Sequence, residues 1–385
     1  MVHVIAGLSV GGAEMTLAKL LSASEPSARD VEVISLTDIG PVGERIKQSG
    51  VSVRALGMRR GRPAITGLIR LSRWLRQSGP NVIQTWMYHA DLIGGLAAKL
   101  GVRAPVVWGV RNGVLDRRSN KRSTIWTAKA CAWLSKLIPC KIVCCSEESG
   151  RFHQRIGYCA DKMVVIPNGF DLEAFKPVPQ ARISIRTELN LPQDALLIGL
   201  VARFDPQKDH QNLILAARRV AEKNLNAYFV LCGDGITWDN PTLGTWLHES
   251  GVKDRFRLLG HREDIPRFMA ALDILASSSY GEAFPNVVGE AMACGVPCVV
   301  TDVGDSAFIV GDTGKVVPPK QPESLAAGLN SMVDLGVEGR RALGGKARRR
   351  VQQNFDLAVI RDRYALLYRE VASGPNLQAG RRSVN

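Results

Sequence analysis

The chain has 385 residues, of which 45% are hydrophobic and 22% charged, a composition typical of a globular protein rather than a disordered one. This length favours two domains over a single core. No apolar run reaches the ~20 residues that span a bilayer, and the N-terminal MVHVIAGLSVGG indicates a first strand rather than a signal peptide. The 8 cysteines include no CxxC pair, which is typical of reduced thiols, so we expect a cytoplasmic protein.

The net charge of +14 is concentrated in the first half of the chain. Residues 1–175 hold 24 Lys/Arg and 13 Asp/Glu, whereas residues 176–385 hold 26 and 23. A basic first half predicts an anionic partner, and nucleic acid, a phosphorylated substrate and an anionic membrane surface all fit that description.

The first half alternates short β-branched runs with amphipathic segments of helix length. The apolar spacing predicts helices over Ala13–Leu21, Ala64–Gln77 and His89–Leu100. The predicted strands are Val2–Ala6, Val31–Leu36, Val51–Ala55, Val82–Gln84, Val106–Gly109, Ile142–Cys145 and Met163–Ile166. This alternation predicts a parallel sheet with helices on both faces.

A connection rich in turn residues, 167–179, interrupts this pattern with three prolines and an Asn-Gly pair. A second series follows, with predicted helices Gln211–Lys223, Pro241–Glu249, Ile265–Ala271 and Asn286–Cys294. Its predicted strands are Leu196–Val201, Tyr228–Cys232, Arg257–Leu259, Ile274–Ala276 and Val296–Val300.

The predicted fold class is therefore α/β, with two consecutive doubly wound, Rossmann-like domains over residues 1–175 and 176–355. The remaining residues, 356–385, contain a predicted helix, Leu357–Val371, that we expect to pack back towards the first domain. Ligands of such domains bind beyond the carboxyl ends of the strands, and they would lie in a cleft if those ends face each other.

Glycine-rich turns follow one predicted strand in each half. Gly11 and Gly12 come after the first strand, and Gly233-Asp234-Gly235 follows the second strand of the second series. Glycine tolerates positive φ and lets a backbone approach a ligand closely. A phosphate-binding turn and a purely structural turn both fit the glycine pair.

Two cations bracket a proline turn after the first strand of the second series. Arg203 and Lys208 flank Pro206, and the next helix is predicted shortly afterwards. An arginine can make two-pronged hydrogen bonds and a lysine supplies a point charge, so together they could neutralise a diphosphate. The alternative is a pair of solvated surface cations.

Two glutamates bracket the start of the helix predicted from Asn286. Glu282 precedes that helix and Glu290 lies within it, eight residues further on. A helix N-terminus attracts phosphate, and a carboxylate can accept hydrogen bonds from a vicinal diol. The pattern favours an anionic ligand that carries hydroxyls, although two solvated charges would also fit.

Taken together, these motifs resemble the GT-B glycosyltransferases of family four, which transfer a sugar from a nucleotide-sugar with retention of anomeric configuration. The resemblance covers nearly the whole chain. It rests on the turns and charged pairs above, on Ile166–Asp171, and on Glu282–Glu290 running into Ala291-Met292-Ala293-Cys294-Gly295-Val296-Pro297.

By this resemblance, Arg203 and Lys208 hold the donor diphosphate, Glu290 holds the ribose and Glu282 holds the transferred sugar. The resemblance also implies nucleotide contacts from the backbone near five further residues, Gly11, Gly12, Phe284, Asn286 and Val287. Gly233 is expected near the base or the floor of the cleft. No metal and no other cofactor is expected, because cations and a helix N-terminus can stabilise the leaving diphosphate.

Two further residues lie at carboxyl ends of strands in the first half. Many family members carry a histidine in the loop after the fourth strand, but here Gln84 and Trp86 occupy the usual positions and His89 is displaced. His89 is predicted to be catalytic or sugar-binding, with helix capping as the alternative. Arg111 is predicted to contact the acceptor or a phosphate.

Basic, tryptophan-containing segments in the first half predict a membrane surface as a partner. One segment holds Arg59, Arg60 and Arg62 followed by Arg70, Arg73, Trp74 and Arg76. The other runs from Asn120-Lys121-Arg122 through Trp126, Lys129, Trp133 and Lys136. Packed helices with solvated cations would produce the same pattern.

We therefore predict a metal-independent, retaining glycosyltransferase. It would move a hexosyl-type group to a carbohydrate or lipid-linked acceptor, in surface polysaccharide, lipopolysaccharide or exopolysaccharide biosynthesis. A nucleotide-sugar epimerase or a sugar phosphorylase is the alternative on the same fold. Nucleic acid is not expected as a partner, because the cations do not alternate with exposed aromatics and the glutamates would have no purpose.

Overall fold

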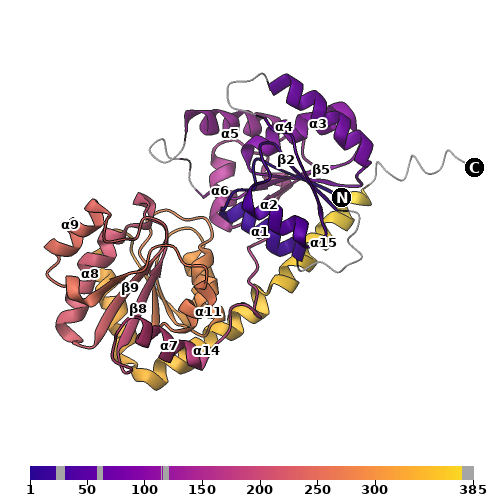
Figure 1. The fold of residues 1–385 in the computed structure, drawn as a ribbon. Coiled ribbons are helices and arrows are strands. Elements are labelled where there is room, and N and C mark those ends of the chain that lie inside the picture. Colours follow the sequence, from indigo (N-terminus) through magenta and orange to yellow (C-terminus); the bar gives the residue numbers. More distant parts are fainter. Residues whose placement is uncertain (23–30, 59–63, 114, 116–120, 375–385) are drawn as a thin grey trace, which may run out of the picture. The chain divides into compact units, whose positions relative to one another are not determined.

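The structure is a computed structural model that describes residues 1–22, 31–58, 64–113, 115 and 121–374. It divides into two compact units (Figure 1). Unit 1 contains Met1–Gly169 and the C-terminal segment from Leu357, and unit 2 contains Phe170–Asp356. The division therefore falls a few residues before the expected boundary at 175, and the C-terminal helix α15 (Leu357–Ala372) belongs to unit 1.

Unit 1 is built on a seven-stranded parallel sheet with the order β3-β2-β1-β4-β5-β6-β7. Because β1 pairs with both β2 and β4, the strand order reverses there. The strands are β1 (Val2–Ile5), β2 (Glu32–Ser35), β3 (Ser52–Ala55), β4 (Ile83–Trp86), β5 (Val106–Val110), β6 (Lys141–Cys144) and β7 (Met163–Val165).

Helices cover both faces of this first sheet. One core cluster joins the sheet to α1 (Gly12–Ser22), α2 (Gly40–Gln48) and α15. The other joins it to α3 (Ala64–Ser78), α4 (Tyr88–Gly101) and α5 (Arg122–Leu134). A sixth helix, α6 (Glu147–Arg155), lies between β6 and β7 in the chain.

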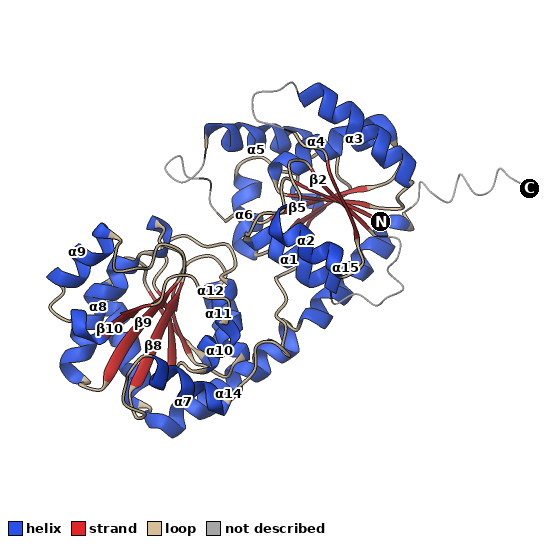
Figure 2. Cartoon of the chain, in the orientation of Figure 1, coloured by secondary structure: helices blue, strands red, loops and turns tan. Residues whose placement is uncertain are grey.

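Unit 2 repeats the design with a six-stranded parallel sheet, in the order β10-β9-β8-β11-β12-β13. Figure 2 shows helices around this sheet. Here the order reverses between β8 and β11. The strands are β8 (Leu196–Val201), β9 (Ala227–Cys232), β10 (Phe256–Leu258), β11 (Ile274–Ser277), β12 (Cys298–Thr301) and β13 (Lys315–Val317).

The helices of unit 2 surround its sheet. They are α7 (Pro179–Glu188), α8 (His210–Lys223), α9 (Pro241–Glu249), α10 (Ile265–Ala270), α11 (Asn286–Ala293), α12 (Ser306–Val310), α13 (Pro322–Asp334) and α14 (Gly336–Asn354). Short 3-10 turns lie at Pro206–Lys208 and Lys253–Arg255. Two doubly wound α/β units confirm the predicted fold class.

The predicted strands are all present, with ends shifted by one or two residues. One strand of unit 2, β13, was not predicted, because it has only three residues and begins with an exposed lysine. Such a short edge strand carries almost no periodic signal.

Candidate active site

The candidate site of unit 2 lies where hydrogen bonds join the loop after β8 to the loop after β11. The Ser278 hydroxyl donates to the Lys208 carbonyl oxygen at 2.9 Å, and the Tyr280 N–H donates to the Gln207 carbonyl oxygen at 2.8 Å. Since these strands flank the reversal of strand order, the loops occupy the position where open α/β sheets bind ligands.

These loops bring two predicted site residues into contact. The Lys208 ammonium lies 2.5 Å from Oε1 of Glu282, and the Ser279 hydroxyl donates to the same oxygen at 2.8 Å. The side chains of Lys208 and Glu282 are 24% and 12% exposed, so the pair is substantially shielded from water. A shielded pair holds its geometry better than a surface pair.

Arg203 also holds a carboxylate. Its guanidinium donates to Oδ2 of Asp205 from Nη2 at 2.8 Å and from Nε at 3.2 Å, and its side chain is 66% exposed. Burial alone would raise the pKa of the Asp205 carboxyl, but the bonds from Arg203 and from the Gln207 N–H outweigh burial and keep that pKa below its usual value. The two predicted cations therefore each carry a carboxylate partner in this structure.

Two aspartates cap the turn that ends at Lys208 and the helix that follows it. Asp205 accepts from the Gln207 N–H at 2.9 Å and caps the short turn that ends at Lys208. Asp209 has φ 49° and accepts from the Asn212 N–H, which starts α8. A non-glycine residue with positive φ is strained, and such strain is concentrated at functional sites.

Gly233 has a structural reason for its lack of a side chain. Its φ is 148°, and a Cβ there would lie 2.2 Å from the Ala202 carbonyl oxygen. The neighbouring Phe204 N–H donates to the Asp234 carbonyl oxygen at 2.7 Å. Gly233 thus lets the loop after β9 pack against the backbone that carries Arg203.

The start of α11 presents backbone rather than side chains. Its N-cap residue is Pro285, and no side chain caps the helix. The Phe284 side chain is buried and packs against Phe170 and Phe355, with ring centroids 6.2 and 5.9 Å away. Any ligand contact of Phe284 would therefore be made by its backbone, while Glu290 lies one turn inside α11 and is half-buried.

In unit 1 the glycine pair differs from expectation, because neither Gly11 nor Gly12 has positive φ. A Cβ at Gly11 would lie 2.4 Å from the Glu14 carboxylate, whereas a Cβ at Gly12 would meet no atom within 4 Å. The fold itself therefore does not require glycine at position 12, where α1 begins. Close approach of a ligand remains the prediction for that residue.

His89 lies in the first turn of α4, beyond the carboxyl end of β4. The preceding Met87 has φ 72° and ψ 157°, an unusual conformation for a residue with a side chain. It turns the chain sharply from strand to helix at the point where the first sheet reverses its order. The strained Met87 was not predicted, since no sequence signal marks it.

Arg111 is engaged within unit 1. Its guanidinium donates to the Asn168 side-chain oxygen and, at 2.6 Å, to the Tyr364 hydroxyl, and it lies 4.7 Å above the Trp86 ring. These contacts give Arg111 a structural role in anchoring α15 to the sheet. Its contact with an acceptor stays a prediction.

Sequence reasoning missed the residues that orient the predicted ones. Ser278 and Ser279 fasten the β11 loop to Lys208 and Glu282, and Asp205 holds Arg203. The run of serines at 277–279 and the Asp-Pro pair at 205–206 are the signals that could have identified them.

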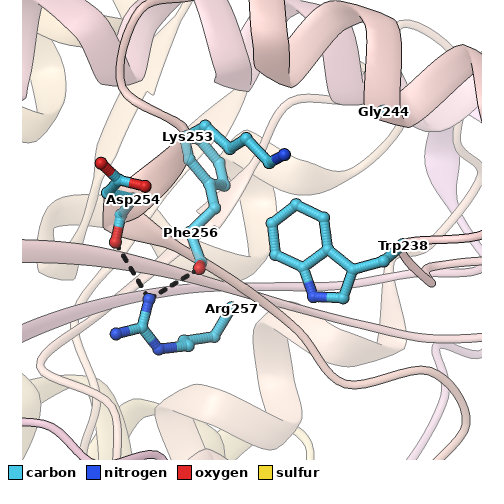
Figure 3. Close-up of a pocket in the computed structure, with 6 residues that line it drawn as sticks. All are labelled: Trp238, Gly244, Lys253, Asp254, Phe256 and Arg257. Carbon is cyan, nitrogen blue, oxygen red and sulfur yellow. Dashed lines mark hydrogen bonds between the residues drawn. The ribbon is translucent and has the colours of Figure 1, made fainter.

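A separate cavity of about 540 Å³ lies beside the edge strand β10 (Figure 3). Trp238 and Lys253 line it, and Arg257 lies on its lower side, where its guanidinium donates to the carbonyl oxygens of Asp254 and Phe256. None of the predicted site residues lines this cavity. Within the described part of the chain, no three His, Cys, Asp or Glu side chains are grouped as a metal site.

Comparison with known proteins gives the class. Residues 10–174 match the family model described as Glycosyltransferase Family 4, and residues 195–334 match the one described as Glycosyl transferases group 1. The fold is similar to that of HepE from Anabaena, solved in complex with UDP, with a TM-score of 0.83 and 23% identity over 95% of this chain and 98% of that chain. The chain belongs to the glycosyltransferases with the GT-B fold, as its motifs predicted.

Two relatives from other bacteria are similar in sequence. The UDP-Gal:alpha-D-GlcNAc-diphosphoundecaprenol alpha-1,3-galactosyltransferase of Escherichia coli is 27% identical over 246 residues, which span 63% of each chain. The D-inositol 3-phosphate glycosyltransferase of Salinispora tropica is 29% identical over 300 residues, which span 69% of this chain and 61% of the relative. The chain thus matches just under two thirds of the length of both relatives.

Proposed function

We propose that this protein transfers a sugar, with retention of configuration, from a nucleotide diphosphate sugar to a carbohydrate or lipid-linked acceptor. The observation that carries this proposal is the contact between Lys208 and Glu282 at the reversal point of the second sheet. In this proposal Lys208 would bind the diphosphate, and the adjacent Glu282 would bind hydroxyls of the sugar. The name of the Escherichia coli relative supports the substrate classes, since it contains a UDP-sugar donor and a diphosphoundecaprenol-linked acceptor.

Cleavage of a sugar–phosphate bond leaves negative charge on the departing diphosphate, and stabilising that charge is the main catalytic task. Lys208 and Arg203 each hold a carboxylate before the donor binds. The donor phosphates would replace or share these partners. Because both Lys208 and Ser279 contact Oε1 of Glu282, its second oxygen can accept a hydroxyl of the transferred sugar.

Binding to a panel of nucleotide sugars tests the donor class. The matching donor, at about 100 times its dissociation constant, should stabilise the protein by about 2.7 kcal/mol in a thermal-shift assay. Addition of acceptor should then release free nucleotide diphosphate. Release of an epimer or of a sugar phosphate would instead assign the fold to the alternative reactions.

Two substitutions test the placement of the donor. Glu290→Gln should weaken binding of the free nucleotide, because the ribose contact is to a charged acceptor. Glu282→Ala should lower turnover more than it weakens nucleotide binding. Glu222→Gln, in an exposed ion pair on α8, is the matched control. If both site variants bind and turn over donor like the parent, the proposed placement is wrong.

Metal independence is part of the same proposal, because Arg203, Lys208 and the start of α11 can together stabilise a diphosphate. Activity should survive an excess of chelator. Complete loss that magnesium restores would contradict this part of the proposal without affecting the donor class. The setting in surface polysaccharide biosynthesis would be tested by the identity of the acceptor.

A further inference from the structure

The outer side of one helical layer in unit 1 combines exposed apolar side chains with cations. Helices α3, α4 and α5 pack side by side on one face of the first sheet, and α1, α2 and α15 cover the other (Figure 1). We call the outward side of the α3–α4–α5 layer the basic face.

Helix α5 turns its largest side chains outward. Trp126 and Trp133 are 70% and 75% exposed, whereas the small Ala128, Cys131 and Ala132 are buried against the sheet. Positions 122, 126, 129 and 133 recur every three or four residues, so Arg122 and Lys129 lie on the same stripe as the two indoles. Packing within unit 1 does not account for two exposed tryptophans on a helix that buries small residues.

Neighbouring helices extend this stripe into a patch. Of nine large hydrophobic residues that are exposed in the described part of unit 1, six belong to the basic face. They are Ile65 and Ile69 on α3, Leu100 on α4, Trp126 and Trp133 on α5, and Leu137 just after α5. Such clustering, unlike scattered exposed residues, marks an interaction surface.

Trp74, which was also expected on this surface, is not part of it. It is half-buried, and the guanidinium groups of Arg54 and Arg70 lie 3.7 and 4.7 Å from its ring. Cations border Trp74 as expected, but one of them, Arg54 of strand β3, covers its ring. Four residues of the predicted segments, Arg59, Arg60, Arg62 and Asn120, lie outside the described residues.

The charge of the basic face has one sign. The three helices hold six Lys/Arg, and their only acid, Asp91, is fully buried. Those cations are Arg70, Arg73, Arg76, Lys99, Arg122 and Lys129. Lys121 and Lys136, both exposed, flank α5. Two copies that associated through their basic faces would therefore bring like charges together, which disfavours such a dimer.

We propose that the basic face binds the surface of a bilayer that contains anionic lipid. Indole rings favour the membrane–water interface, where one edge is apolar and the other hydrated. Lysine and arginine near the same plane are attracted to anionic headgroups. The two features on one helix are typical of proteins that lie on a membrane.

Within the part of the chain that the structure describes, no helix combines the length and the apolar character needed to cross a bilayer.

The basic face also adjoins the edge of unit 1 where a ligand is expected. In a parallel sheet the covering helices begin at the carboxyl ends of the strands, so Trp126 and Ile65 lie near the same edge as His89. An acceptor carried by the bilayer could reach that edge while the basic face stays bound. Membrane binding itself does not depend on the proposed transfer reaction.

Flotation of the full chain with vesicles tests the proposal. One set contains phosphatidylcholine alone, and the other contains phosphatidylcholine mixed with phosphatidylglycerol. At low salt the protein should float only with the second set, and high salt should release it, because headgroup attraction is screened. Recovery at the bottom of the gradient under all conditions would overturn the proposal, and so would equal flotation with both sets.

Two double variants separate the contribution of the cations from that of the tryptophans. Arg122→Gln with Lys129→Gln should lower the partition coefficient about 30-fold, since each cation contributes about fivefold near an anionic surface. Trp126→Ser with Trp133→Ser should lower it at least about tenfold, because the buried area of the rings is lost. Trp238→Ser is the matched control, since this residue is 47% exposed in unit 2.

Circular dichroism and thermal unfolding should be unchanged in the surface variants, because the replaced side chains are exposed. Equal losses with Trp238→Ser, or no loss with either pair, would overturn the assignment of the basic face. Concentration-dependent dimerisation that the tryptophan pair abolishes would assign this face to a second copy and contradict the proposal.

Discussion

The two units share a strand order, but the loops near the point where that order reverses differ in what their cations contact. Beyond β8 and β11, unit 2 places Lys208 against Glu282 in a partly open position. In unit 1, Arg111 follows β5, one strand beyond the reversal between β1 and β4, and its guanidinium donates to Asn168 and Tyr364 of the same unit. Topology determines where a site can form, whereas the side chains decide whether a ligand or the protein itself fills it.

The units also treat ionisable groups differently. Among the described residues of unit 1, Asp91 and His3 are buried and neither forms a salt bridge. Burial raises the pKa of Asp91 well above its usual value and lowers the pKa of His3 to about 3. Unit 2 pairs Asp264 with Arg262 and Arg267, whose hydrogen bonds hold the pKa of Asp264 at about 2 despite some burial. Asp91 of unit 1 therefore favours its neutral form, whereas Asp264 of unit 2 favours its ionised form.

The largest predicted effect concerns Asp91. Because its pKa is about 3.9 when unfolded and higher when folded, the folded state holds one more proton between these two values, and the stability of unit 1 falls by about 1.4 kcal/mol per pH unit as pH rises. Asp91→Asn removes this dependence. The stability of the variant relative to the parent should therefore rise as pH increases above about 4.

Hydrogen exchange of amides in β4 and β5 measures this difference, because two-domain chains rarely unfold in one step. Thr16→Val, which removes a buried hydroxyl from α1 without changing a titratable group, is the control and should show no such slope. A flat difference for Asp91→Asn would mean that the carboxyl stays ionised in the fold.

Lys208→Ala tests the candidate site of unit 2. Loss of one preorganised donor to the leaving diphosphate should lower kcat about 10²–10³-fold, equivalent to about 2.7–4 kcal/mol. The measurement is steady-state kinetics with the donor identified by thermal shift. Arg218→Ala removes an exposed cation from α8 of the same unit and should leave kcat nearly unchanged. A loss below tenfold for Lys208→Ala would remove this residue from catalysis.

Periodicity and turn residues were sufficient to predict the fold, because both record local preference and burial along one segment. Every predicted strand is present, and α11 begins at Asn286 as expected. The contact of Lys208 with Glu282, 74 residues apart, has no local signal. Their common site followed only from the family resemblance, and their pairing in the absence of a donor was not predicted at all.

Exposure was harder to predict than secondary structure. Trp74 and Trp126 both lie on basic helices. Arg54 of strand β3 covers Trp74, whereas Trp126 stays 70% exposed although Lys129 lies 5.4 Å from its ring. Arg111 was expected to face a ligand, yet Tyr364 of the C-terminal helix lies against it. Each difference comes from a partner distant in sequence, which composition and spacing cannot identify.

Arg111→Ala tests whether Arg111 has a structural role in unit 1. The substitution removes two hydrogen bonds and the stacking on Trp86, so unit 1 should lose about 2–3 kcal/mol of stability. Hydrogen exchange in α15 reports the loss. Arg363→Ala, whose exposed guanidinium donates to the Val165 carbonyl oxygen from the same helix, should cost less than half as much. Unchanged stability with a raised KM for acceptor would instead support the predicted ligand contact.

The smallest predicted effect has the opposite dependence on pH. The folded pKa of Asp264 is about 2 and its unfolded value is about 3.9, so its contribution is present above pH ~4 and is lost as pH falls towards 2. Its side chain is 37% exposed, so solvent screening reduces this contribution to about 1 kcal/mol. Asp264→Asn should therefore destabilise unit 2 at neutral pH and converge with the parent in acid. Hydrogen exchange of amides in α10 measures this change in stability. Asp239→Asn, which removes an exposed carboxylate from a loop, is the control for losing one negative charge.

Together, Asp264→Asn and Asp91→Asn should give two profiles of stability against pH that have opposite slopes in non-overlapping pH windows. Parallel profiles would show that the two units do not differ in how they hold carboxyl groups.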